Sequence, residues 1–469
     1  MSAPPGVARP DPAGTGEPAP VRDLADAPGP SRGQLLLALR RMLGDPLGYL
    51  GQARDTYGPL TAFVVADPPA VLLSDPDDVH RVLVANHRGY TKRTIQYDTL
   101  ATVTGDGLLV SDPPRWTRRR RMMQPGFHRD ALAGVAAHTV AAARSQAERL
   151  RPGVVDVDEV MMHAALEVVG AAVFSTDLSG RAATLVPAVL TALDRVVLRA
   201  RSPWLPPPAV PTPGNLRLRR ALATIDGAVA DMVRQRRADP GRSAQDVLDL
   251  LLAGTADDPE DAALAAVRDE SVTLLIAGHE TVASALTWTW HLLVDHPDGY
   301  DRLLAEVDAL DGDPGLEDLP RLPFTRAVLD EALRLYPPAW ILTRRAAAED
   351  VLSGYRVPAG SLVLISTWAL HRDPALWPHA AAFRPQRWLG PESQRGPRWA
   401  YLPFGAGPRQ CIGKDFALVE ATLMLAVLAR RVRFHRPEGA APPQVEALVT
   451  LRPKAGLPLR VEYRRAASS

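Results

Sequence analysis

The sequence contains one cysteine, Cys411, in 469 residues. An intramolecular disulfide is therefore impossible, and a four-thiolate zinc site or an iron–sulfur cluster within one chain is excluded because each needs several sulfurs. Long apolar runs are also missing, and no stretch reaches the roughly 20 residues that span a bilayer. From the absence of such a run and of a secretion-type N-terminus, we expect a cytoplasmic protein without a membrane span.

Strong charge is lacking as well, since the net charge is +1 and no overall field selects nucleic acid. The basic residues are nearly all arginine, with lysine only at positions 92, 414 and 454. A Gly-x-Ser-x-Gly elbow is missing, which argues against a hydrolase of that class. The segment Gly105-Asp106-Gly107 is followed by Val110 where a dinucleotide fingerprint needs a third glycine, so a nicotinamide or flavin site is discounted.

What remains is a chain able to bury a large core, with 46% hydrophobic and 23% charged residues. Residues 1–32 are rich in Pro, Ala and Gly, and this composition predicts a disordered tail. Residues 33–469 then form one domain, in which helical periodicity dominates and short β-branched stretches predict small β-sheets. The longest predicted helix runs from about Pro259 to Leu293, with Asp258 as its N-cap.

The single cysteine lies in a glycine-rich frame, Phe404-Gly-Ala-Gly-Pro-Arg-Gln-Cys411-Ile-Gly413. One thiolate is enough protein ligand for haem, whose macrocycle supplies four nitrogens. Glycines allow the backbone to pass close beneath a flat ring, and amides at the start of the next helix can donate to the sulfur and favour the thiolate. The alternative is a buried cysteine that acts as a small hydrophobe.

A second unusual segment is Ala277-Gly-His-Glu-Thr281, which interrupts the apolar face of the long helix. Glycine in a helix costs about 1 kcal/mol relative to alanine, and a buried glutamate needs a partner. Such defects in a core helix usually mark function. The alternative is that Thr281 bonds back to its own helix while Glu280 reaches solvent.

Taken together, these motifs resemble those of the cytochrome P-450 monooxygenases. The Cys411 loop is similar to the family's haem-binding loop, and the 277–281 segment to its oxygen-activation motif. Glu331, Arg334 and Arg387 resemble its buried Glu-Arg-Arg cluster. The resemblance implies the mainly α fold of the family, one haem b between the long helix and the Cys411 loop, and the insertion of one oxygen atom from O2 into a substrate. It also implies that Cys411 ligates the iron and that Glu280 and Thr281 deliver protons beside the iron's sixth position.

The resemblance further implies contacts to the haem propionates. Trp116 and Arg120 share a helical face and match a family pair, Arg409 is another candidate, and spacing favours Arg345 over Arg344 as the last. The expected cofactor-binding set is Cys411, Trp116, Arg120, Arg345, Arg409, Phe404, Gly405, Gly413, Ala277 and Gly278.

The segments expected to line the substrate pocket are apolar and include Leu108, Leu109, Trp340 and Ile341. We expect a hydrophobic metabolite, such as a terpenoid, a polyketide or a fatty-acid derivative, although a peptide-derived aromatic compound also fits. A haem-thiolate isomerase, a peroxygenase and a non-catalytic haem binder are alternatives, against which the acid and alcohol pair argues.

The chain is expected to be a monomer that draws electrons from a separate ferredoxin and its reductase, because it holds no redox cofactor motif other than the haem loop. The docking face is predicted from a set of arginines near the proximal side, namely Arg118, Arg119, Arg121, Arg430 and Arg431.

Overall fold

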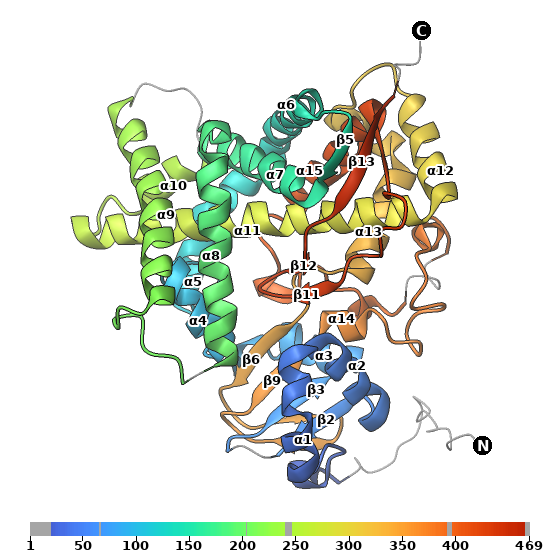
Figure 1. Cartoon of the computed structure of the whole chain (residues 1–469). Helices are drawn as coiled ribbons and strands as arrows, with labels where there is room; N and C mark the ends of the chain where they lie inside the picture. Colours follow the sequence, from blue (N-terminus) through green and yellow to red (C-terminus); the bar gives the residue numbers. More distant parts are fainter. Residues whose placement is uncertain (1–19, 65–66, 203, 240–245, 392–395, 465–469) are drawn as a thin grey trace.

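The computed structural model describes residues 20–64, 67–202, 204–239, 246–391 and 396–464. One long helix, α11 (Glu260–Asp295), crosses the middle of the molecule, and the other helices pack around it (Figure 1). Its 36 residues correspond to about 54 Å at 1.5 Å per residue. The predicted long helix is confirmed, but Asp258 does not cap it; Pro259 occupies the N-cap position without a side-chain bond.

Each of the remaining helices has apolar residues at helical spacing, and these residues face the core. The most extensive helix–helix contacts are those of α7 with α11, of α15 with α6 and of α8 with α9. In chain order they are α1 (Arg32–Gly44), α2 (Pro46–Tyr57), α3 (Pro76–His80), α4 (Ile95–Thr104), α5 (Arg115–Met123), α6 (Leu132–Arg149), α7 (Val157–Phe174), α8 (Ala182–Arg201), α9 (Pro213–Ala238), α10 (Val247–Gly254), α12 (Pro297–Asp308), α13 (Pro323–Leu335), α14 (Thr367–Leu370) and α15 (Lys414–Arg431).

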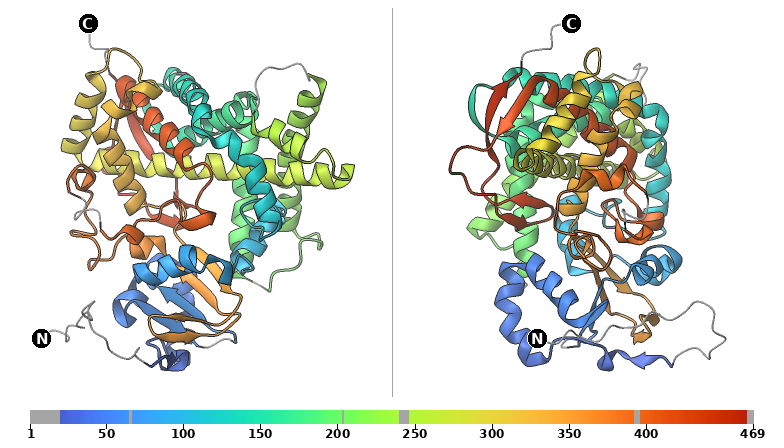
Figure 2. Two further views of the ribbon diagram at one scale, coloured as in Figure 1. Left: turned by 180° about the vertical axis from the view of Figure 1, so that it is seen from behind. Right: turned by 90° about the vertical axis from the view of Figure 1, so that its right-hand side faces the viewer.

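Small sheets lie on either side of α11, as both rotated views show (Figure 2). The largest has the order β2 (Leu60–Phe63), β3 (Ala70–Leu73), β9 (Leu362–Ile365), β6 (Leu342–Ala346) and β4 (Tyr90–Thr91). The others are β1 (Arg22–Asp23) with β8 (Tyr355–Val357) and β7 (Asp350–Leu352), β10 (Val432–His435) with β13 (Pro458–Tyr463) and β5 (Gly153–Asp156), and β11 (Val445–Ala447) with β12 (Leu451–Pro453).

The predicted Glu-Arg-Arg cluster is confirmed as a fully buried structural site. Glu331 Oε1 accepts from Arg334 Nη2 at 2.8 Å and from Arg387 Nε at 3.0 Å. Trp388 donates its indole N–H to Glu331 Oε2 at 2.9 Å. Because a charge buried at 0% exposure requires this many donors, the cluster fixes α13 against the segment that leads to the cysteine loop.

The predicted tail boundary at residue 32 is wrong for the residues that the structure describes. Strand β1 pairs with β8, and Leu24, which follows β1, is buried in an apolar cluster with residues of this sheet such as Tyr355 and Val357. The Arg22 guanidinium lies 3.9 Å from the Tyr355 ring centroid. Residues 1–19 of the predicted tail lie outside the described residues. Among the described helices, none combines the length and the apolarity needed to cross a bilayer.

Candidate active site

The cysteine loop forms a tight turn immediately before α15. The Cys411 N–H donates to the Phe404 carbonyl at 2.9 Å, and Gly405 and Gly407 adopt φ values of +66° and +69°. A side chain at Gly407 would lie 2.1 Å from the Leu83 carbonyl oxygen, whereas the Cβ position at Gly405 is open. Gly405 thus leaves the room predicted for a ring, while Gly407 is required by packing against residues 81–85.

The electrostatics of Cys411 suit a metal thiolate. The Cys411 residue is exposed to solvent, which argues against the alternative of a buried cysteine acting as a small hydrophobe. Desolvation by the groups packed around the sulfur still raises the pKa of the thiol, while a hydrogen bond from the Gly413 backbone and the nearby charge of Arg120 lower it. The predicted amide donor to the sulfur is therefore present. A thiol whose pKa stays above its ordinary value needs a further positive charge to ionise, and a bound iron would provide it.

Cationic side chains gather between α5, β6 and the cysteine loop; this cationic cluster consists of Lys92, Arg120, Arg344 and Arg409. Arg120 Nη1 donates to the Gln410 carbonyl at 2.7 Å, and Arg409 lies 4.6 Å from the Trp116 ring centroid. Lys92 Nζ donates to the Leu109 carbonyl at 2.6 Å. The structure thus brings together the predicted residues Trp116, Arg120 and Arg409.

The cationic cluster has more positive charge than its protein partners balance. Among the described residues, Asp112 is the carboxylate that contacts this cluster, and its Oδ1 accepts from Arg409 Nη2 at 2.6 Å. Burial, Arg344 and Arg409 together hold the pKa of Lys92 well below its ordinary value. Two propionate groups would supply the missing negative charge, so the residues present fit a haem on this charge balance.

The prediction that Arg345 faces the cofactor is wrong. Successive residues of a strand point to opposite faces, and in β6 it is Arg344 that is buried at 7% exposure beside Tyr97. Arg345 Nη1 instead donates to the Gly360 carbonyl at 2.9 Å, and its Nε donates to the Arg93 carbonyl at 2.5 Å. Arg344 therefore takes the place that was predicted for Arg345.

Ala277, Gly278 and Thr281 keep partial exposure within the otherwise buried middle of α11. Thr281 Oγ1 donates to the Ala277 carbonyl at 2.7 Å, as the back-bonded alternative predicted. Gly278 has a packing role, since a Cβ there would lie 2.7 Å from Val169 Cγ2 of α7. The accessible stretch of α11 thus consists of Ala277, Gly278 and Thr281, and its one polar side chain is the Thr281 hydroxyl.

Glu280 does not lie on the accessible side of α11, so its predicted place beside the iron is wrong in this conformation. It is 3% exposed, and its Oε1 accepts from Thr450 Oγ1 at 2.8 Å and from Arg452 Nη1 at 3.5 Å. Neighbouring residues of a helix point about 100° apart, so the acid and the alcohol face different surroundings. Burial raises the pKa of the Glu280 carboxyl.

Sequence reasoning missed Lys92, Asp158 and Arg452, and it considered Arg344 but preferred Arg345. Lys92 carried a usable signal, because it is one of three lysines in an arginine-rich chain. Asp158 and Arg452 belong to no motif, and only tertiary packing brings them to Glu280.

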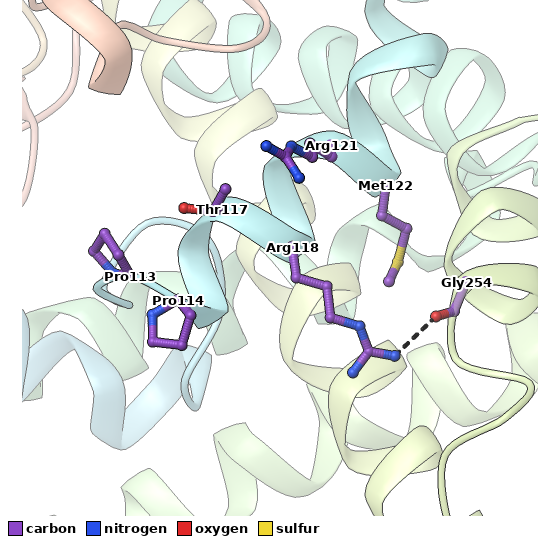
Figure 3. Close-up of a pocket in the computed structure, with 7 residues that line it drawn as sticks. All are labelled: Pro113, Pro114, Thr117, Arg118, Arg121, Met122 and Gly254. Carbon is purple, nitrogen blue, oxygen red and sulfur yellow. Dashed lines mark hydrogen bonds between the residues drawn. The ribbon is translucent and has the colours of Figure 1, made fainter.

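The predicted docking arginines are mostly engaged in internal contacts. Arg118 lines a surface pocket beside α5 and donates to the Gly254 carbonyl at 3.1 Å (Figure 3), and it also pairs with Asp258. Arg119 pairs with buried Glu270 at 2.8 Å. Arg430 donates to the Leu310 carbonyl at 3.0 Å, and Arg431 pairs with Asp313. Arg121, exposed in the same pocket, is the member best placed to meet a partner.

Comparisons with known proteins agree with this geometry. The family model for cytochrome P450 matches residues 27–459. The chain is 38% identical over 427 residues to cyclooctatin synthase of Streptomyces melanosporofaciens, covering 87% of this chain and 89% of that one. It is 34% identical to pentalenene oxygenase of Streptomyces avermitilis, covering 84% and 88%.

The fold comparison points the same way. The crystal structure of CYP175A1 from Thermus thermophilus superposes with a TM-score of 0.76 at 32% identity, covering 93% of this chain and 100% of that one. The mainly α architecture and the haem-thiolate chemistry predicted from the motifs are therefore confirmed. The chain belongs to the cytochrome P450 family of monooxygenases.

Proposed function

We propose that this P450 oxygenates a hydrophobic terpenoid in secondary metabolism, with haem b as cofactor and electrons from a separate ferredoxin. The observation that carries the proposal is the cysteine loop facing a cationic cluster of uncompensated charge, in a chain whose relatives include cyclooctat-9-en-7-ol 5-monooxygenase and pentalenene oxygenase. The apolar residues around the expected pocket fit such a substrate, since they offer few polar groups to hold a hydrophilic one.

In this proposal Cys411 ligates the iron, and Lys92, Arg120, Arg344 and Arg409 hold the propionates. When bound, the haem supplies O2 binding and activation, and the thiolate favours O–O cleavage. The protein contributes position and protons. Thr281 is the hydroxyl that holds a proton on the accessible side of α11, while the apolar residues around it exclude water.

The test is turnover of cyclic terpene hydrocarbons and alcohols with a ferredoxin, its reductase and NADPH under 18O2. We expect a product that carries one 18O atom from O2 and none from labelled water. Cys411→Ser is the matched control, which should lose both the turnover and the red-shifted Soret band of the ferrous carbon-monoxide complex.

Three outcomes would contradict the proposal. Turnover that needs hydrogen peroxide and ignores the ferredoxin would identify a peroxygenase. Rearrangement of the substrate without 18O would identify an isomerase. A retained red-shifted band in Cys411→Ser would overturn the ligand assignment.

A further inference from the structure

Helix α1 presents leucine side chains to solvent. Leu36 is 75% exposed, Leu37 is 87% exposed, and Leu43 near the end of the helix is 37% exposed. Leu37 is the most exposed large hydrophobic side chain among the residues that the structure describes. A single exposed leucine needs no explanation, but two adjacent leucines at this exposure form a patch that folded proteins normally cover or use for binding.

The opposite side of α1 holds the helix to the core, so the exposed leucines are not a product of fraying. The helix begins with a capping box, in which Ser31 Oγ accepts from the Gln34 N–H at 3.3 Å and Gln34 Oε1 accepts from the Ser31 N–H at 2.8 Å. Leu35, Ala38 and Met42, at helical spacing, pack against apolar residues of α2, β2 and β3. This inner row fixes which side of α1 faces outward.

The outward side of α1 also carries positive charge. Arg40 lies one turn after Leu36 and Arg41 lies one turn after Leu37, so each exposed leucine shares a row with an arginine. Both arginines are exposed. The helix contains no acidic residue, although the whole chain has 53 acidic residues against 54 basic ones. The next acid along the chain, Asp45, is engaged as the N-cap of α2. The outward side of α1 therefore combines apolar side chains with cations.

The size and charge of this surface decide between its possible partners. A specific protein interface buries about 800 Å² on each partner, and the exposed leucines of one helix present only a fraction of that area. A second copy of this chain, docked through the same face, would also bring the arginines of both copies together. A bilayer with anionic lipids requires neither a large area nor a shaped surface, because leucines enter the acyl boundary while arginines reach the phosphates.

We propose that α1 binds reversibly to the surface of bilayers that contain anionic phospholipids. Leu36 and Leu37 enter the interface, and Arg40 and Arg41 bind the lipid phosphates. Figure 1 shows α1 at the outer edge of the molecule, where a flat surface can reach it. This binding is separate from the proposed oxygenation and does not depend on it. Its consequence is that the protein resides beside the phase in which hydrophobic metabolites concentrate.

The test is co-sedimentation of the haem-loaded full chain with sucrose-filled vesicles, measured by protein remaining in the supernatant. Vesicles of equal parts phosphatidylglycerol and phosphatidylcholine are compared with vesicles of phosphatidylcholine alone. We expect about tenfold tighter binding to the anionic vesicles, because each arginine near an anionic surface adds to the attraction. The difference should vanish at high salt, since the lipid charge is then screened.

Paired substitutions separate the apolar and the cationic contributions. Leu36→Ser with Leu37→Ser should weaken binding to anionic vesicles by about tenfold or more, because the apolar insertion is lost. Arg40→Gln with Arg41→Gln should reduce that binding to the level of the neutral vesicles. The matched control is Val154→Ser, which should bind as the wild type does. Val154 is 58% exposed in β5, which lies across α11 from α1 (Figure 1).

The substituted side chains face solvent, so each variant should keep the Tm and the haem spectrum of the wild type. A wild-type chain that stays in the supernatant with anionic vesicles would overturn the proposal. So would binding that survives the leucine substitutions, or binding to anionic vesicles that ignores the arginine substitutions. Lipid-free dimerisation that the leucine substitutions abolish would identify a second copy as the partner instead. Since the measurement needs no turnover, failure to oxygenate any terpenoid would refute the proposed function alone.

Discussion

Arg344 and Arg345 are adjacent in sequence, yet only one of them contributes charge to the cationic cluster. Arg344 is buried with Lys92 and Arg409, whereas Arg345 bonds backbone carbonyls on the other face of β6. We predict that Arg344→Met weakens haem retention by about tenfold, as loss of a charge-assisted contact worth about 1.4 kcal/mol would. The measurement is the rate of haem transfer to excess apomyoglobin. Arg345→Met is the matched control and should lose haem at the wild-type rate; equal rates for the two variants would contradict the assignment to Arg344, and faster loss from Arg345→Met would return the role to Arg345.

Thr281 is the hydroxyl on the accessible side of α11, where Ala277 is its near neighbour. We predict that Thr281→Ala keeps haem and substrate binding but diverts most NADPH-derived electrons to peroxide or water, because the proton holder is lost. The measurement is product and peroxide formed per NADPH oxidised. Thr281→Ser, which keeps the hydroxyl, should restore coupling; if alanine couples as well as threonine, the hydroxyl only stabilises the helix.

At the scale of elements, the loop after α4 is clamped to α11 by two acids. Asp269 Oδ2 accepts from the Asp106 N–H at 2.9 Å, and Glu270 Oε2 accepts from the Leu108 N–H at 3.0 Å. A side chain at Gly107 would meet Thr273 Oγ1 at 2.1 Å, so the loop can lie this close only with glycine there. The clamp holds one wall of the expected substrate pocket against the helix that carries Thr281.

Burial raises the pKa of Glu270 to about 6, against the opposing effects of Leu108 and Arg119. A carboxyl with a raised folded-state pKa contributes stability that is present below its unfolded value and lost as pH rises through the folded value. We therefore predict that this group lowers the free energy of unfolding of the wild type by about 1 kcal/mol between pH 4.5 and 6, out of about 2 kcal/mol over its whole titration. Glu270→Gln should lack that slope in urea titrations, and an unchanged slope would assign it to other groups.

The elements and motifs that depend on local pattern could be predicted from the sequence. The long helix, the cysteine loop and the Glu331 cluster all follow from spacing within short segments. The sequence patterns did not predict the directions in which individual side chains point. The side on which Glu280 or Arg344 emerges depends on helix rotation and strand register, and these are fixed by distant partners such as Thr450 and Val363.

For the molecule as a whole, the internal contacts of the arginines change the surface that we propose for ferredoxin docking. This surface now consists of the arginines whose side chains are exposed. Arg430 donates hydrogen bonds to backbone carbonyls at the C-terminal end of α12. We therefore expect Arg430→Glu to lower the Tm of the protein and to leave ferredoxin docking unchanged. Arg121 belongs to α5 (Figure 3), and its side chain is exposed. We predict that Arg121→Glu slows ferredoxin-dependent reduction several-fold at low salt, with the difference vanishing at high salt. Stopped-flow reduction at two ionic strengths is the measurement, and wild-type rates at low salt would place docking elsewhere.

The charge of the cationic cluster also implies that haem binding stabilises the folded protein. Lys92 and Arg120 precede Arg344 and Arg409 by more than 200 residues in the chain. Among the described residues, Asp112 does not offset the mutual repulsion of these four side chains. The haem-free chain should therefore leave these segments apart until propionates arrive as counter-ions, and occupancy then stabilises the native state by mass action. We therefore expect the lifetime of this protein against cellular proteases to increase with the supply of haem.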